Sequence, residues 1–394
     1  MKIKCLLLLF LTTWSAMGQP QTEGPEKILS EIEKNNTTLA ALRQKVVTEQ
    51  KANEMSKALP DPRVGFSNSW GNQPNSVNKQ NFSVEQELDW GTVSGLRNKT
   101  IEANKSVVEF DYLIERQKIL AEADQYLIEL IYYNALYEEY AQRVQRAEDL
   151  KDLYAKKLKI GDANQLEVNK VKLNAVSNRA EFKKIAVKKE EILDELKRLN
   201  GNIPIVCELK QNNCQVLPTL SDLMKQIETM SPILQKSKKQ IEAGKKELQL
   251  NKLEGLPNLS IGYVGEIARG DNTNGFSIGM NIPIWGNSRR KINYQKTVVT
   301  LAEMEKKDME LQITATIQKQ YAAANHLTQI AKEFRQELSQ NEDLSLLDKA
   351  LNQGQISLID YINEITFYYT AREQALEAER DSQMAISELK NMLR

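Results

Sequence analysis

Histidine is almost absent from this chain of 394 residues, and so are the sequence patterns of most enzymes. His326 is the only histidine, so a zinc site or a histidine-dependent catalytic triad would have to be built around it. It falls in the middle of a predicted helix, where an imidazole on the surface or between helices is the simpler interpretation. HExxH, P-loop and GxSxG patterns are missing as well. We therefore expect no enzyme activity, no catalytic residue, no metal site and no cofactor.

Neither sign of charge is in excess. Lys and Arg together number 53, and Asp and Glu together number 53, so the formal net charge is zero. A general nucleic-acid-binding protein carries a basic excess or a basic patch, so we expect no nucleic-acid partner. Charged residues make up 27% of the chain and aromatic residues 6%. This composition suits long solvated helices better than a thick globular core.

The N-terminal segment has the features of a secretory signal peptide. Lys2 and Lys4 precede the apolar run Leu6–Leu11, and Ala16-Met17-Gly18 offers small residues at the positions that signal peptidase requires. We expect residues 1–18 to be removed on export, because the apolar run is too short for a membrane anchor.

Cysteine is scarce. The mature chain keeps only Cys207 and Cys214. In an oxidising compartment such a short, even pair predicts a disulfide, and the alternative is two unpaired thiols in a loop.

The mature chain is a tandem repeat in which the second copy follows the first at a distance of about 195 residues. Each copy predicts a helix, two short strands, a very long helix and a further helix. Leu-Pro precedes the strands of each copy and Trp-Gly follows them. The predicted helices are 26–57, 100–158 and 165–199 in the first repeat (19–201), and 223–253, 292–351 and the C-terminal helix in the second (219–394), with 202–218 as the linker.

The two longest predicted helices need neighbours along their whole length. Apolar residues recur at three- and four-residue steps through 292–351, which predicts a helix of about 90 Å. This stretch has no run of apolar residues long enough to cross a bilayer as a helix. The corresponding stretch 100–158 carries two adjacent apolar stripes, which indicates one neighbouring helix on each side.

The four predicted strands alternate between apolar residues and small or polar ones, and their length is that of tilted strands crossing a bilayer. Four strands cannot close a barrel, and an open edge in lipid is prohibitively costly, so the edges must pair with other copies of the chain. Two copies would give a barrel filled by side chains, and three would leave room for a passage. The residues that we expect to face the membrane are Val64, Phe66, Trp70, Phe82, Val84, Leu88, Leu259, Ile261, Tyr263, Phe276, Ile278, Met280 and Ile282.

The signal peptide, the repeat and its Leu-Pro and Trp-Gly markers resemble the TolC family of outer-membrane factors, over essentially the whole mature chain. Chain length and the stretch 90–97 are similar to the branch that serves heavy-metal resistance–nodulation–division pumps. The resemblance implies a mainly α-helical homotrimer with a small transmembrane β part. Its twelve-stranded barrel would lie in the outer membrane of a Gram-negative bacterium and continue into a long α-helical tunnel through the periplasm. It also implies a periplasmic adaptor protein and an inner-membrane transporter as partners.

A signature that the resemblance associates with adaptor docking occurs twice. It consists of Gly161, Asn164, Leu166 and Glu167 in one copy and Gly354, Ser357, Ile359 and Asp360 in the other, with Asp162 and Gln355 beside the glycines. The same spacing also has a purely structural explanation. Glycine ends one helix in the left-handed conformation, Asn or Ser caps the next helix, and the acid three residues later closes a capping box. We expect both to hold, with the turn forming the tip of the tunnel.

Three functions are compatible with these features. The first is the exit duct of a tripartite efflux pump, which passively conducts metal ions or small toxic compounds. The second is the outer-membrane duct of a type I protein secretion system, which the sequence does not separate from the first. The third is a soluble periplasmic coiled-coil scaffold, which explains the helices but not the four alternating strands.

Overall fold

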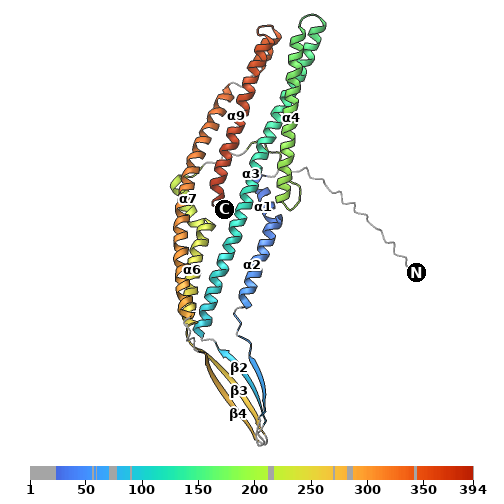
Figure 1. Ribbon diagram of the computed structural model, residues 1–394. Helices are drawn as coiled ribbons and strands as arrows, with labels where there is room; N and C mark the ends of the chain where they lie inside the picture. The colour runs from blue at the N-terminus through green and yellow to red at the C-terminus, as the bar shows by residue number, and fades with distance from the viewer. Residues whose placement is uncertain are drawn as a thin grey trace, which may run out of the picture.

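Long helices and a small sheet make an elongated molecule (Figure 1). The computed structural model describes residues 24–393 except 56, 59, 71–77, 89–90, 212–216, 269–270, 282–286 and 341–343. The sheet lies at one end of the molecule, and two turns between helices lie at the other. The predicted signal peptide, Cys214, Ile282 and both tryptophans of the Trp-Gly markers lie outside the described residues.

The two halves of the chain have the same order of elements, except that the long helix of the second half is divided into α7 and α8. Within the described residues, the first half contains α1 (Pro25–Asn35), α2 (Thr37–Met55), β1 (Arg63–Ser69), β2 (Lys79–Leu88), α3 (Gly91–Lys159) and α4 (Gln165–Leu199). The second contains α5 (Leu220–Met230), α6 (Pro232–Leu253), β3 (Asn258–Ala268), β4 (Asp271–Asn281), α7 (Asn287–Gln340), α8 (Ser345–Asn352) and α9 (Leu358–Asn391).

The first helix of each half is broken in two, so the prediction of single helices over 26–57 and 223–253 is wrong. Asn36 separates α1 from α2, and its side-chain oxygen accepts a hydrogen bond from the Leu39 amide at 2.9 Å, which caps α2. In the second half the break is at Ser231. Pro232 follows it as the first residue of α6, and a residue before proline is disfavoured in a helix.

The long helix of the second half is also interrupted, so the prediction of one helix over 292–351 is wrong. α7 ends at Gln340 and α8 begins at Ser345, whereas α3 runs through its 69 residues without a break. Residues 341–343, between the two helices, lie outside the described residues.

The sheet is antiparallel, with the order β1-β2-β3-β4. Its register places Val64, Val84, Tyr263 and Phe276 in one row across the four strands. β4 begins at Asp271 and pairs with β3 from there, so the Asn- and Gly-rich residues 271–275 belong to a strand. Both edges of the sheet, β1 and β4, have no neighbouring strand within the described chain.

Apolar clusters hold the helices together along the body. One joins α1, α3 and α4, another joins the ends of α3 and α4 to α8 and α9, and a third joins α5, α7 and α9. None of the described helices is apolar enough over a sufficient length to span a membrane.

Candidate functional site at the hairpin tips

The turn between α3 and α4 is a tight helical hairpin. Gly161 adopts φ = +77°, and its amide donates to the Leu158 carbonyl at 3.1 Å. The Asp162 amide donates to the Lys157 carbonyl at 2.9 Å. These two hydrogen bonds are those of a Schellman motif, which satisfies carbonyls at a helix end and needs a residue that tolerates positive φ.

The next helix starts with the capping box that its sequence predicts. The Asn164 side chain accepts from the Glu167 amide at 3.0 Å, and the Glu167 carboxylate accepts from the Asn164 amide at 2.8 Å. Both carboxylates of this turn are therefore engaged, since Asp162 also forms an ion pair with Lys157 at 3.4 Å.

The turn between α8 and α9 repeats this geometry. Gly354 has φ = +68°, and the Gly354 and Gln355 amides donate to Leu351 and Ala350 at 3.1 and 2.9 Å. Ser357 caps α9 by accepting from the Asp360 amide at 3.1 Å. The second carboxylate interaction differs from the predicted capping box, because Asp360 accepts from the Ser357 hydroxyl at 2.6 Å.

We call the turn between α3 and α4 the first tip and the turn between α8 and α9 the second tip. Apolar side chains project from both tips. Ile160 and Leu166 of the first tip are 78% and 79% exposed, and Ile359 of the second tip is 50% exposed. Below them, one buried cluster contains Tyr154 and Val168 from the first hairpin and Leu351 and Tyr361 from the second. The structure thus brings the predicted docking residues to the same end of the molecule, on two hairpins that share a core.

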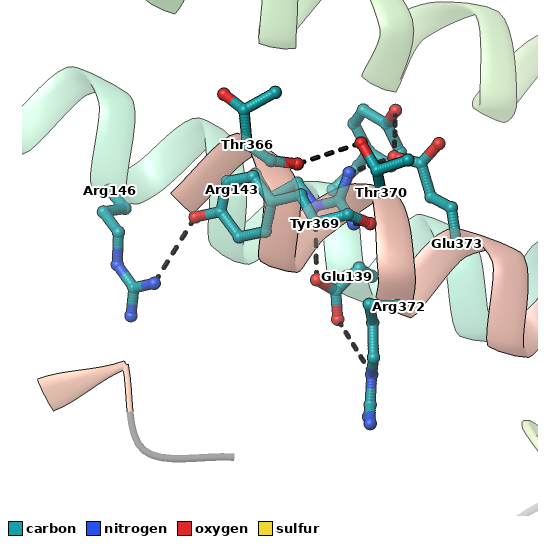
Figure 2. A network of polar contacts seen from close by, with 9 residues as sticks. Glu139, Arg143, Arg146, Thr366, Tyr369, Thr370, Arg372 and Glu373 are labelled. Atoms are coloured by element: carbon teal, nitrogen blue, oxygen red, sulfur yellow. Dashed lines mark hydrogen bonds and ion pairs between the residues drawn. The ribbon is translucent and has the colours of Figure 1, made fainter. Parts of the chain in front are cut away.

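A polar network that the sequence did not predict ties the two hairpins together farther from the tips (Figure 2). Arg143 of α3 forms an ion pair with Glu373 of α9, and its guanidinium donates to the Tyr369 carbonyl at 3.0 Å and to Glu139 at 3.2 Å. Its guanidinium also lies 4.2 Å from the centre of the Tyr369 ring. Arg372 extends the network to the other oxygen of Glu139 at 3.6 Å.

Burial makes this network costly to break. Only 3% of the Arg143 side chain is exposed, so its charge depends on these partners rather than on water. Burial raises the pKa of the neighbouring Tyr140 hydroxyl, as does its hydrogen bond to Glu373. Arg143 follows Leu136 and Tyr140 at the four- and three-residue steps of a buried seam. A charge in such a seam is the signal that could have pointed to the network.

Most of the large apolar side chains of the sheet lie on one of its faces. The predicted membrane-facing residues within the four strands lie on this face, where Phe66, Phe276 and Ile278 are 69%, 91% and 78% exposed. Trp70 follows the end of β1. The opposite face carries small and polar residues such as Ser83, Ser260 and Ser277. So large an apolar surface in contact with solvent marks a membrane or protein interface.

Cys207 is buried in the cluster of α1, α3 and α4, and it forms no disulfide within the described residues. Burial raises the pKa of this thiol. The extended linker around it is fixed by Asn134 of α3, whose amide donates to the Cys207 and Leu209 carbonyls at 2.9 Å each. Its expected partner Cys214 lies outside the described residues, so the disulfide stays a prediction.

The described part of the chain holds no group of three or more metal-ligating side chains. His326 lies on the exposed surface of α7.

Comparison with solved structures identifies the fold. A membrane protein from Pseudomonas aeruginosa superposes with a TM-score of 0.75 at 16% identity, covering 94% of this chain and 93% of that one. The outer-membrane channel OprN gives 0.76 at 12% identity, covering 94% and 89%. The outer membrane protein VceC of Vibrio cholerae gives 0.70 at 13% identity, covering 94% of each chain.

The chain has an outer-membrane channel fold. This confirms the fold that the TolC resemblance implied, in its mostly helical composition and its small sheet. No protein-family model and no curated protein sequence matches the chain. Within the outer-membrane channel fold, the hairpin tips and the sheet lie at opposite ends of the molecule (Figure 1).

Proposed function

We propose that copies of this chain assemble into a passive duct that spans the outer membrane of a Gram-negative bacterium and extends into the periplasm. The observation that carries this proposal is the unclosed sheet. One of its faces is polar and the other exposes Phe66, Phe276 and Ile278, as expected for strands with water on one side and lipid on the other.

Closure of this sheet requires other copies of the chain. The unpaired edges β1 and β4 can satisfy their backbone groups in lipid only by pairing with each other across copies. The helical body has matching unpartnered surfaces. α4 exposes Leu166, Leu173 and Val187, and α7 exposes Leu301 and Leu311. Three copies would give twelve strands, enough to leave a passage between them, which supports a homotrimer.

The hairpin tips are the end that would meet the rest of an export machine. They lie at the opposite end of the molecule from the sheet, so a sheet in the outer membrane leaves them in the periplasm (Figure 1). Ile160, Leu166 and Ile359 are exposed there on rigid, capped turns. We propose that these turns dock a periplasmic adaptor protein, which connects the duct to an energised inner-membrane transporter.

The cargo would be metal ions or small toxic compounds. A duct for type I protein secretion has the same requirements and is the second candidate. A soluble periplasmic scaffold is disfavoured, because it would place the apolar face of the sheet in water at a large cost in free energy.

The experiment is to purify the full chain in detergent and reconstitute it in planar bilayers. A duct gives discrete conductance steps, a particle larger than one 45.0 kDa chain and resistance to alkaline extraction from membranes. A protein that washes off membranes and conducts nothing is a scaffold. A deletion strain grown with metal salts, bile salts and antibiotics then separates metal export from broad export, and unchanged growth with loss of a secreted protein would favour type I secretion.

A further inference from the structure

The two hairpin tips share one backbone geometry but differ sharply in charge. When the tips are aligned on Gly161 and Gly354, residues 156–172 correspond to residues 349–365. The first stretch contains five lysines and two carboxylates, whereas the second contains one lysine and two carboxylates. The first tip is therefore basic and the second slightly acidic, although their Schellman motifs and N-caps correspond position by position.

Most of the charge on the first tip is available to a partner. Its two carboxylates are already engaged, Asp162 with Lys157 and Glu167 in the capping box. The remaining lysines are exposed, and none of them forms an ion pair within the described residues. These are Lys156, Lys159, Lys170 and Lys172.

The apolar surface is concentrated on the same tip. Ile160 and Leu166 are 78% and 79% exposed beside these lysines, whereas the position of Ile160 is taken by Gln353 in the second tip. A protruding apolar pair flanked mainly by lysines has the composition of an interface core with a charged rim. The second tip offers amides at two of the lysine positions, Asn352 for Lys159 and Asn363 for Lys170.

We propose that the first tip is the dominant contact for the adaptor, and that the adaptor meets it with an acidic surface around an apolar centre. This inference rests on the proposed function, since it names the chemistry of the partner at the same tips. The proposed homotrimer has three first tips and three second tips. These six tips would then form alternating strong and weak docking sites.

The test compares two matched double substitutions in the full-length protein, expressed in the deletion strain. Lys159→Glu/Lys170→Glu reverses the charge of the first tip, and Asn352→Glu/Asn363→Glu adds the same carboxylates at the aligned positions of the second. All four positions are exposed. The level of protein in the outer membrane and the single-channel conductance of each variant report whether the duct itself still assembles.

We expect the first variant to conduct normally but to lose export, leaving growth as sensitive as that of the deletion strain. The second variant should retain export. Equal loss in both variants, retention in both, or loss in the second alone would each overturn the proposal. A wild-type protein without conductance would instead contradict the duct itself, so the two failures are distinguishable.

Selection for restored export in the Lys159→Glu/Lys170→Glu strain adds a second readout. We expect suppressors in the adaptor that replace a carboxylate with a neutral or basic residue, because these remove like-charge repulsion. Suppressors that change only apolar adaptor residues would contradict an acidic surface.

Discussion

Arg143 is the only buried charged residue among the described residues, and the groups around it compensate its charge. Two carboxylates, a backbone carbonyl and two aromatic rings surround its guanidinium. Because these partners come from both α3 and α9, a single side chain couples the two hairpins. In the proposed duct this coupling would oppose separation of the hairpins.

Replacing Arg143 with methionine should destabilise the protein by about 3 kcal/mol, because Glu139 and Glu373 lose the cation that compensates them. The Glu373 side chain is 36% exposed, so water partly replaces its lost interaction with Arg143. Thermal unfolding in detergent measures the effect. The matched control is Lys184→Met, which breaks an exposed pair with Glu181 and should cost no more than about 0.5 kcal/mol. Equal melting temperatures for the two variants would contradict the role assigned to Arg143.

Glu33 provides a prediction about pH. Hydrogen bonds from Arg116, at 2.6 and 2.7 Å, hold the pKa of this carboxylate below its usual range. A lowered pKa in the folded state contributes stability above the usual value of about 4, and this stability is lost as the pH falls through the lowered pKa. Glu33→Gln should therefore be less stable than the wild type at neutral pH, and the difference should shrink in acid. A difference independent of pH would argue against the ion pair as its cause.

At the scale of elements, breaks and caps decide where each helix can turn. Asn36 and Ser231 break the first helix of each half, and Gly161 and Gly354 end the helices that lead to the tips. In each case the sequence carries a local device: an N-cap, a proline or a glycine at positive φ. These local features fix the residues at which the helices end or change direction.

Glycine-to-alanine substitutions should have opposite effects at two positions. Gly161→Ala should destabilise the first tip by about 1–2 kcal/mol, because alanine is strained at φ = +77° although nothing lies within 4 Å of its Cβ. Gly95→Ala, in α3 and equally free of contacts, should stabilise by about 0.5–1 kcal/mol, because alanine favours a helix. Thermal unfolding of both variants measures the difference. A change in stability of the same sign for both substitutions would contradict the left-handed conformation of Gly161 as the cause.

At the scale of the whole molecule, separation of the sheet from the tips is the organising feature. Long helices hold the two ends apart, and α3 alone spans 69 residues, or about 100 Å of helix. The sheet at one end and the capped hairpin turns at the other give the molecule a direction, as the proposed duct between two compartments requires.

Neighbouring residues of β4 should respond differently to a lysine. Ile278→Lys places a charge on the apolar face and should impair insertion, at a cost of about 2–4 kcal/mol if the position lies near the middle of the bilayer. Ser277→Lys places the same charge on the polar face and should be tolerated. The amount of assembled protein in outer-membrane fractions measures both. Equal insertion of the two variants would argue against a lipid-facing sheet.

Local patterns predicted most of the elements and part of the site. The period of apolar residues gave the strands and long helices, and the Gly-x-x-Asn and Gly-x-x-Ser spacings gave the capped tips, because these features depend on residues within a few positions of each other. The breaks at Asn36 and Ser231 were missed although their signals are local. In these places the apolar period continues across the break and hides it.

The sequence by itself therefore determined the repeat, the alternation of the strands and the geometry of the tips. Only the tertiary structure decided which strands form the sheet edges, which helix faces are left without neighbours and how Arg143 is compensated. Arg143 and Glu373 are 230 positions apart, and β2 meets β3 only because the two halves of the chain lie side by side. Such contacts depend on how rigid elements pack in space, and the spacing of residues along the chain does not specify that packing.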